Sequence, residues 1–412
     1  MQTTDPPMQL SQRVRSLKPS ATFAVNARVR QLRAQGRDII GLGAGEPDFE
    51  TPPEIKQAAI DALLSGQTHY MPVAGEPTAR EAIAQKLRVE NGIACSADHV
   101  VITVGAKHAF YLAMQCLIDP GQGQQVILPT PAWVSYRPII ELAGGEVVEV
   151  PGPMETEFKI TPDQLSRAIT DRTAAVIINS PSNPCGTMYR PDELRALAEV
   201  LNRHDQITII TDEIYEKLIY GGIEHFSLGS IEAIADRVVT INGLSKAYAM
   251  TGWRIGYACA PGNDGVFAGA MEKLQGQMTS NITSFCYAAV VESLRNGAAA
   301  VEQMRRVFAE RAELIHELLG RWPQVKCPKP TGAFYVFPDI SAHFGKRSAA
   351  GSVIDSSVAF AEALLEEANV AVVPGEDFGA CARGHVRLSF AASPQQISEG
   401  CGRIDTWLRQ LR

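Results

Sequence analysis

The chain has 412 residues, of which 45% are hydrophobic and 20% charged, an ordinary globular composition that predicts two or three domains. A formal net charge of −7 argues against a nucleic-acid partner, because proteins that bind nucleic acids usually carry a basic surface. No apolar run reaches the roughly 18 residues needed to span a bilayer, so a membrane partner is not expected either.

The N-terminal segment, the cysteines and the histidines bear on the location of the protein and on disulfide or metal sites. The first ten residues contain Asp5 and two prolines without an apolar core, which is unlike a secretory signal. The eight cysteines form no CxxC pair, and the eight histidines form neither an HxxxH nor an HExxH motif. We therefore expect a cytoplasmic protein with no disulfide framework and no metal site.

Short β-rich runs alternate with helical stretches between about residues 97 and 260, a pattern typical of a parallel sheet between helical layers. Runs that are almost wholly apolar, such as residues 174–178, indicate strands that are covered on both faces. The predicted strands span residues 99–104, 125–128, 146–150, 174–179, 207–211, 238–242 and 254–260.

The C-terminal part has a different pattern, with two long helical stretches near 264–296 and 299–321 that are separated at Gly297. Further helices are predicted at 353–368 and 394–411, and short strands at 332–337, 370–373 and 385–390. We therefore predict an α/β fold with a mostly parallel seven-stranded sheet between helices, and a smaller α+β domain built from both chain ends. The predicted boundaries are 1–49 for an N-terminal segment packing with the small domain, 50–295 for the large domain and 296–412 for the small domain.

Unusual residues follow four of the predicted strands, at the edge where such sheets bind ligands. Gly105-Ala106-Lys107 opens a helix whose free N–H groups suit a phosphate, although taken alone a plain tight turn is the better interpretation. Asn183 lies in a loop that two prolines and a glycine stiffen. Such a loop could orient a ring substituent, or it could simply form a turn.

The other two strand ends carry ionisable groups. Asp212 and Tyr215 could address two atoms of one ring, although Asp212 could instead cap a helix. Lys246 follows Ser245, with Arg254 eight residues later, and a lysine at the rim of a buried sheet is costly unless neutral or covalently used. Taken alone, however, an ordinary surface lysine is the better interpretation. Together the four loops supply an amine, a carboxylate, a phenol, an amide, a guanidinium and a helix start. These are the groups that hold pyridoxal phosphate.

Further motifs surround these loops. They include Lys18–Thr22, Gly45–Phe49, His69-Tyr70, Pro131–Tyr136, Asn183-Pro184, Met250–Arg254 and Gly384–Ser389. In this order the set resembles the class I aminotransferases, which are fold-type I pyridoxal-phosphate enzymes, and it is most similar to their bacterial aspartate and prephenate aminotransferase branch. The resemblance extends from about Leu10 to Leu411.

The resemblance implies a role for each residue at the cofactor. Lys246 would form the Schiff base with pyridoxal 5′-phosphate and then shuttle a proton on the substrate adduct. Asp212 would pair with the protonated pyridine nitrogen, while Tyr215 and Asn183 would contact the ring 3-oxygen. The other implied contacts are Ser245, Arg254, Gly105, Ala106 and Lys107 at the phosphate, Trp133 on the ring face, and Tyr70 at the phosphate of a neighbouring subunit.

For the substrate, the resemblance implies that Arg387 grips the α-carboxylate as a bidentate fork, a geometry that a lysine cannot copy. The other implied substrate contacts are Gly45, Trp133, Asn183, Lys107 and Thr22, the last two as candidates for a distal carboxylate. Two positions depart from the family pattern. Asn281 stands where relatives contribute partner-subunit side chains, and Cys185 stands where many have threonine. A homodimer with shared active sites is expected.

These implications predict an aminotransferase that moves the amino group of aspartate or glutamate to 2-oxoglutarate or oxaloacetate by a ping-pong mechanism. Prephenate or a broader substrate range stays open, as does a β-lyase or a cyclase on the same scaffold, because the fold does not fix the reaction. A transcription regulator with a degenerate aminotransferase-like domain is not expected, since the chain is acidic and only about forty residues precede Gly45.

Overall fold

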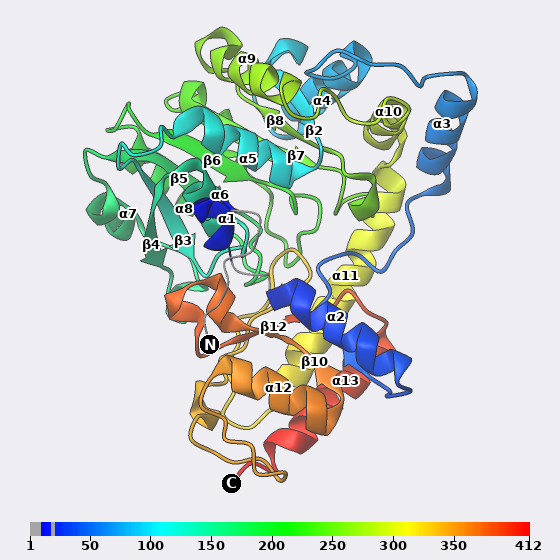
Figure 1. Ribbon diagram of the computed structural model, residues 1–412, viewed down its shortest axis with the longest axis vertical. Coiled ribbons are helices and arrows are strands. Elements are labelled where there is room, and N and C mark those ends of the chain that lie inside the picture. The colour runs from blue at the N-terminus through cyan, green and yellow to red at the C-terminus, as the bar shows by residue number, and fades with distance from the viewer. Residues whose placement is uncertain (1–9, 18–20) are drawn as a thin grey trace.

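The computed structural model describes residues 10–17 and 21–412, except for the side chains of residues 21–24 and 26. Its upper part in Figure 1 contains a seven-stranded sheet with the strand order β2-β8-β7-β6-β5-β3-β4. The strands are β2 (Val100–Thr103), β3 (Gln125–Thr130), β4 (Glu146–Pro151), β5 (Thr173–Asn179), β6 (Thr208–Asp212), β7 (Val238–Gly243) and β8 (Gly256–Cys259). Each strand predicted for this region is confirmed, with ends that differ by two residues or fewer.

The strand directions bring the four polar loops to one edge of this sheet. Strands β3 to β7 pair in parallel, whereas β8 is antiparallel to both of its neighbours, β7 and β2. Strand β2 therefore runs in the same direction as β7. As a result, the carboxyl ends of β2, β5, β6 and β7 lie on one edge, and Arg254 reaches that edge just before β8 begins.

Both faces of the sheet are buried, as the apolar strands predicted. On β5, Ala175 and Ile177 belong to a core that includes residues of α5 (Ala106–Leu117), α6 (Tyr136–Ala143) and α9 (Gly262–Gly276). The alternate residues, Val176 and Ile178, belong to a second core with α7 (Pro162–Ala168) and α8 (Pro191–Leu201). A third core joins β2 and β8 to α3 (Pro53–Leu64), α4 (Pro77–Glu90) and α10 (Cys286–Asn296). The predicted α/β class, a mostly parallel sheet between helices, is therefore confirmed.

The lower part of Figure 1 combines segments from both ends of the chain, and α11 (Ala298–Leu319) runs into it from the region of α10. It contains α12 (Ser357–Ala368), α13 (Pro394–Leu408), β9 (Tyr335–Val336), β10 (Val370–Ala371), β11 (Val373–Pro374) and β12 (Val386–Ser389). From the N-terminal side come α2 (Ala21–Ala34) and β1 (Ile40–Gly41), whereas α1 (Gln12–Arg15) appears in the upper part of Figure 1, at the level of the large sheet. Strand β1 pairs in parallel with β10, and Val29 and Leu32 of α2 share a small core with Leu365 and Ala371.

Several helices begin where local sequence signals require it. In α13, the Ser393 hydroxyl accepts from the Gln396 N–H and the Gln396 amide oxygen accepts from the Ser393 N–H, each at 3.2 Å. This reciprocal cap, followed by proline, satisfies N–H groups that the first helical turn leaves free. Within residues 10–17 and 21–412, no helix combines the length and the apolar character that crossing a bilayer requires.

The helix predicted over residues 264–296 is wrong in its middle. The chain instead forms α9 and α10, with a stretch at 277–285 that is not helical and in which Ser280 has a φ of +60°. The N–H groups of Met278, Thr279 and Ser280 all donate to the Gln275 carbonyl and so end α9. The serine, threonine and asparagine side chains of this stretch favour turns over helix interiors, and apolar residues on both sides masked that signal.

Candidate active site

A cavity of about 460 Å³ opens at the carboxyl edge of the seven-stranded sheet. Its wall consists of the loops after β2, β3, β5, β6 and β7, the Gly45-Glu46 segment, and residues of β9 and β12. The predicted site residues that line it are Gly45, Ala106, Lys107, Trp133, Asn183, Asp212, Tyr215, Ser245, Lys246, Arg254 and Arg387. The fold thus collects around one cavity residues that are more than 300 positions apart in the sequence.

Lys246 lies in this cavity, partly buried, and its Nζ donates a hydrogen bond of 2.6 Å to the Gly45 carbonyl oxygen. Burial lowers the pKa of Lys246 to about 8, assisted by the positive charges of Arg387 and Arg254 and opposed by Glu46 and Asp212. A lower pKa increases the fraction of neutral amine, which is the form that attacks a carbonyl carbon. The position of Lys246 therefore suits a nucleophilic and proton-carrying role.

Asp212 presents a buried carboxylate at the carboxyl end of β6. Its Oδ2 accepts a hydrogen bond of 2.6 Å from the Tyr136 hydroxyl, and its Oδ1 accepts one of 3.2 Å from the Ile214 N–H. Burial raises the pKa of Asp212 to about 6, although these two hydrogen bonds oppose the rise. A cationic ring nitrogen at this carboxylate would favour its ionised form.

Tyr215 lies beside Asp212 and supplies a protonated phenol. Its hydroxyl is 3.0 Å from the hydroxyl of Tyr335, a residue of β9 that is itself fully buried and lines the cavity. Burial raises the pKa of both phenols above the usual value of 10, so both remain hydrogen-bond donors at neutral pH.

Arg387 extends from β12 into the cavity wall and is only 2% exposed. Its terminal nitrogens donate to the Asn183 side-chain oxygen and to the Gly43 carbonyl, each at 2.9 Å. Its guanidinium carbon lies 4.6 Å from the ring centroid of Tyr335. Both hydrogen-bond acceptors are neutral, and Nε has no partner within the described part of the chain. A buried cation of this kind suits an anionic substrate group.

Positive charge and free N–H groups also gather at the start of α5. Arg254, whose φ is +58°, donates from one terminal nitrogen to the Thr251 carbonyl at 3.0 Å. Gly105 precedes the helix with a φ of +82°, and a Cβ there would lie 2.5 Å from a terminal nitrogen of Arg254. Lys107 holds its Nζ 5.0 Å from the Trp133 ring centroid. Helix N–H groups beside a guanidinium form an anion site.

The family comparisons agree with this geometry. Residues 37–404 match the family model described as aminotransferase class I and II. The chain belongs to this aminotransferase family. An aspartate aminotransferase of Geobacillus stearothermophilus is 46% identical over 97% of this chain and 99% of its own length. An aspartate/prephenate aminotransferase of Cereibacter sphaeroides is 45% identical over 98% and 99%.

Solved structures of other aminotransferases share the fold. An aspartate aminotransferase of Rhizobium meliloti superposes with a TM-score of 0.93 at 37% identity, covering 98% of this chain and 100% of that one. The Thermus thermophilus aspartate aminotransferase with maleate superposes with a TM-score of 0.89 at 43% identity, covering 97% and 99%. The predicted family and fold-type I architecture are therefore confirmed, together with pyridoxal 5′-phosphate, on which these aminotransferases depend.

The residues present fit this cofactor. Asp212 is a buried carboxyl group with a raised pKa, and a protonated ring nitrogen beside it would lower that pKa. Gly105 lets the Arg254 guanidinium pack directly against the helix start, because a Cβ there would lie 2.5 Å from a terminal nitrogen of Arg254. Lys246 lies in the same cavity with a lowered pKa. An amine, an acid and an anion site thus surround one cavity, as pyridoxal phosphate requires.

Some of the residues named from the sequence do not line the cavity. The Tyr70 side chain is 90% exposed and lies outside the cavity wall, while the Thr22 side chain lies outside the described residues. Asn281 lies outside the cavity wall, where it donates to the neighbouring Ile282 carbonyl and accepts from the N–H of the distant Met71. Cys185 is buried in an apolar cluster that includes Phe337 and other small-sheet residues, so it fills space.

The sequence interpretation of the site missed several cavity residues, three of which have polar side chains that contact the site. Tyr136 holds Asp212, Tyr335 contacts Tyr215, and Glu46 accepts a hydrogen bond of 2.8 Å from the Thr251 hydroxyl. Tyr136 and Glu46 belong to motifs that the resemblance includes, but nothing local reveals their partners. Tyr335 lies in a predicted strand and carries no such signal.

Replacing Gly105 by alanine is expected to weaken cofactor binding about 10-fold to 100-fold. The new Cβ would displace Arg254, and the loss of a charge-assisted hydrogen bond is worth about 1.5–3 kcal/mol. The measurement is the dissociation constant of pyridoxal phosphate, from the absorbance of the bound cofactor. Gly121→Ala is the matched control, since Gly121 has a φ of +86° and open space around its Cβ position. Equal cofactor affinity in the two variants would contradict the assignment.

Proposed function

We propose that the chain catalyses reversible transfer of the amino group of aspartate or glutamate to 2-oxoglutarate or oxaloacetate. The observation that supports this most strongly is the pair of cations, Arg387 and Lys107, lining the same cavity as Lys246. A dicarboxylic amino acid presents two anionic groups to such a cavity. Relatives named aspartate aminotransferase, and the Thermus structure that contains the dicarboxylate maleate, agree with this substrate class.

When bound, pyridoxal phosphate supplies a carbonyl group that exchanges amines and a ring that withdraws electrons from the substrate Cα. We propose that the Lys246 amine, once released from the cofactor, removes the Cα proton and returns it during the transfer. Asp212 keeps a proton on the ring nitrogen, because an ionised carboxylate favours the cationic form of its partner. Tyr215 and Asn183 donate hydrogen bonds to the ring oxygen.

Arg387 orients the substrate through its α-carboxylate. Each of its terminal nitrogens already donates one hydrogen bond, to Asn183 or Gly43, and has a second N–H for a carboxylate oxygen. Since the guanidinium is held from two sides, ordering it at the moment of binding costs little entropy. The Gly45 backbone and Trp133 complete this part of the site. The Ser245 hydroxyl, Arg254 and the N–H groups of Ala106 and Lys107 bind the phosphate, with Gly105 at the start of the helix.

The active unit that we propose is a homodimer with shared sites, in which Tyr70 reaches the phosphate bound by the partner. Its support is the exposure of the Tyr70 ring together with large apolar side chains on α3, where Leu63 and Leu64 are 45% and 80% exposed. Thr22 and Lys107 are the proposed contacts of the distal carboxylate. The domain boundaries after residues 49 and 295, and a cytoplasmic location, remain predictions.

The test is a set of half-reactions of the purified enzyme with single amino acids, followed by the absorbance of the bound cofactor. We expect aspartate and glutamate to react fastest and alanine slowly. In Lys107→Ala, the apparent dissociation constants of the two dicarboxylates should rise about tenfold or more, since a hydrogen bond to a charged group is lost. Alanine should react with the variant as it does with the parent.

Lys273→Ala is the control for the Lys107 variant, because Lys273 is an exposed lysine on α9 away from the cavity. Equal losses for alanine and aspartate in Lys107→Ala would contradict a distal-carboxylate role. Prephenate with an amino donor belongs in the same set, since relatives named aspartate/prephenate aminotransferase are as similar as those named for aspartate alone. Release of pyruvate and ammonia from cystathionine, without amino transfer to 2-oxoglutarate, would instead identify a β-lyase.

A further inference from the structure

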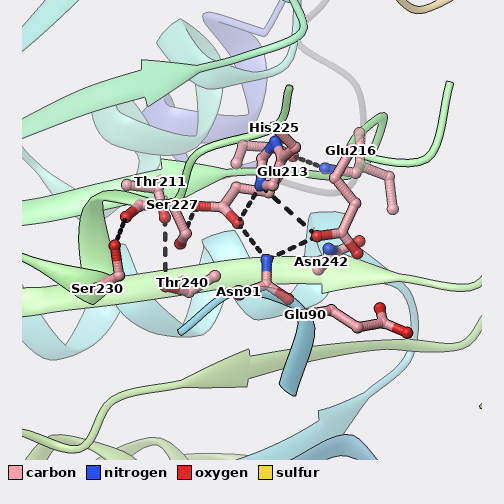
Figure 2. Close-up of polar contacts among 12 residues, drawn as sticks. Glu90, Asn91, Thr211, Glu213, Glu216, His225, Ser227, Ser230, Thr240 and Asn242 are labelled. Atoms are coloured by element: carbon pink, nitrogen blue, oxygen red, sulfur yellow. Dashed lines mark hydrogen bonds and ion pairs between the residues drawn. The ribbon is translucent and has the colours of Figure 1, made fainter. Parts of the chain in front are cut away.

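The turn that follows β6 presents functional groups on two opposite sides. Asp212 and Tyr215 line the cofactor cavity. Glu213 and Glu216 lie outside the cavity wall and enter a separate buried polar cluster, shown in Figure 2. We name this cluster the carboxylate network, and its members are Lys86, Asn91, Glu213, Glu216, His225 and Ser227. No step of the proposed reaction uses any of them.

Glu213 is only 3% exposed and has a partner on each carboxylate oxygen. Its Oε1 accepts from the Ser227 hydroxyl at 2.7 Å. Its Oε2 lies 3.0 Å from the His225 Nε2 and accepts from the Asn91 side-chain amide at 3.1 Å. The dashed lines of Figure 2 show that these partners reach Glu213 from segments on different sides.

Glu216 is held by the end of α4. Lys86 donates to its Oε1 in a short ion pair, and Asn91 donates to its Oε2 at 2.7 Å. Lys86 also donates to the Asn91 side-chain oxygen at 2.8 Å. Because the Asn91 amide nitrogen donates to both Glu213 and Glu216, the two carboxylates share one amide. All three side chains are buried, with exposures of 8% or less. The two glutamates are therefore tied together as well as to α4.

The charges of the network balance when His225 is protonated. Burial opposes the charged form of His225, but the hydrogen bond and negative charge of Glu213, with Glu216, raise its pKa above 6.5. Burial likewise opposes ionised Glu216, yet Lys86 and His225 lower its pKa to about 2. Within the network two carboxylates thus face two cations, while Glu90, 3.9 Å from Lys86, pairs with Lys217 beside it. Buried ion pairs of this kind add little net stability, because desolvation offsets their attraction, so a large contribution to stability does not explain them.

The turn between the network and the cavity is short and hydrogen-bonded. The Glu213 N–H donates to the Ile241 carbonyl of β7, and the Glu216 N–H donates to the Glu213 carbonyl, both at 2.9 Å. The N–H of Ile214, the residue after Glu213, donates directly to Asp212 Oδ1. Any rotation of the turn that moves the Glu213 side chain would therefore move a hydrogen bond that Asp212 depends on.

We propose that Glu213 and Glu216 are positioning residues, which fix the Asp212 carboxylate and the Tyr215 phenol at the cofactor because the network anchors the opposite side of their turn. The inference rests on the proposed function of Asp212 and Tyr215. A displacement of about 1 Å at reacting groups can reduce a rate roughly 100-fold, so holding this turn has a large effect on catalysis.

A divalent cation is the alternative occupant of the network. Ligand atoms of Glu213, Glu216 and His225 lie within 4.8 Å of one another. The ammonium group of Lys86 already lies against Glu216, however, and supplies the positive charge that the two carboxylates require. Metal analysis of the purified holoenzyme separates the two cases. One equivalent of a divalent metal, lost in Glu213→Gln, would overturn the positioning proposal.

The test compares Glu213→Gln with the parent holoenzyme. Glutamine has the size of glutamate, but it cannot accept at both side-chain atoms from Ser227, His225 and Asn91. We expect kcat to fall about 10-fold to 100-fold, with the KM for the amino donor changed less than about threefold. The pH titration of the bound cofactor's absorbance should also shift its midpoint to higher pH. We attribute this shift of the midpoint to the Tyr215 phenol, which would be less well placed at the ring oxygen.

Glu367→Gln is the matched control. Glu367 also accepts from a serine and a ring N–H, at 2.6 Å from Ser348 and 3.1 Å from Trp407, but it lies in the small C-terminal part of the fold. Both variants should unfold at lower temperature than the parent, whereas only Glu213→Gln should shift the absorbance titration. If the two variants behave alike in kcat and in that titration, the network is merely structural and the proposal is wrong.

Ser227→Ala keeps the proposal testable if Glu213→Gln does not fold. It removes one donor to Glu213 and leaves both ion pairs in place, so we expect the same shift in titration at smaller size. A Ser227→Ala enzyme with a parental titration would overturn the proposal. A parent protein that binds no cofactor, or that fails to react with acidic amino acids, would instead refute the proposed function.

Discussion

Replacing Lys246 by alanine is expected to abolish turnover while leaving the fold and most of the cofactor site intact. The amine has two proposed tasks, to exchange with the substrate amine at the cofactor and to move the Cα proton. General acid–base transfer alone contributes about 10²–10⁴-fold, and the lost exchange adds to that deficit. Lys246 makes one hydrogen bond, to Gly45, and is only partly buried, so its removal leaves the core unchanged.

The cofactor should still bind to Lys246→Ala, because Asp212, Arg254 and the start of α5 remain. Steady-state kinetics, cofactor absorbance and circular dichroism measure the three effects separately. Lys107→Ala is the control, since it removes another lysine of the same cavity and should retain turnover with alanine. A Lys246→Ala enzyme with turnover within tenfold of the parent would contradict the assignment.

Replacing Asp212 by asparagine is expected to reduce kcat strongly while the cofactor stays bound. Asparagine has the same shape and can still contact Tyr136 or Ile214, but it cannot pair ionically with a ring nitrogen. A hydrogen bond to a charged group is worth about 1.5–3 kcal/mol in binding, and its effect on a transition state that gathers negative charge should be larger. Near-normal transamination by this variant would show that Asp212 has another role.

The same substitution should stabilise the protein when no cofactor is bound. Because the pKa of folded Asp212 is raised from 3.8 to about 6, the folded state holds a proton that the unfolded chain has already lost in that range. The free energy of unfolding therefore falls as the pH rises from about 4 to 6. Asparagine removes this cost, so the variant should be more stable than the parent at pH 7 by up to roughly 3 kcal/mol.

Denaturant unfolding of both cofactor-free proteins at pH 4 and pH 7 measures this difference. The stability gain of Asp212→Asn should be present at pH 7 and be small at pH 4, where the parent carboxyl is protonated in the folded state and about half protonated in the unfolded chain. A less stable variant at pH 7 would mean that Asp212 is already well compensated without the cofactor. The predicted opposition between activity and stability is common where function requires a poorly solvated charge.

The sequence predicted the sheet and the cavity edge because both depend on local signals. Apolar runs bounded by glycine, proline or aspartate marked the strands, and residues just beyond a strand end, such as Asp212 and Lys246, had to meet at one edge. The break at 277–285 was missed because apolar periodicity on both sides resembles one continuous helix. Helix breaks of this kind depend on tertiary contacts, here those of Gln275 with Val73 and Ile102.

Partners far apart in the sequence could not be predicted without the structure. Tyr335 reaches Tyr215 across 120 positions, and Lys86 reaches Glu216 across 130. Nothing near either residue in the sequence indicates its partner. The alternation of Asp212 and Glu213 does predict opposite directions for their side chains. It does not predict that His225, Ser227 and the Asn91 amide contact Glu213. Such contacts arise only when α4 and the segment of His225 pack beside the end of β6.

Borohydride reduction of the holoenzyme, followed by proteolysis and peptide mapping, tests the central claim most directly. The reduction fixes the cofactor to whichever amine it is bonded to. The site geometry predicts a single pyridoxyl label on the peptide that contains Lys246, and no label in the Lys246→Ala variant. A label on Lys107, or on any lysine outside the cavity, would contradict the account of how this aminotransferase holds its cofactor.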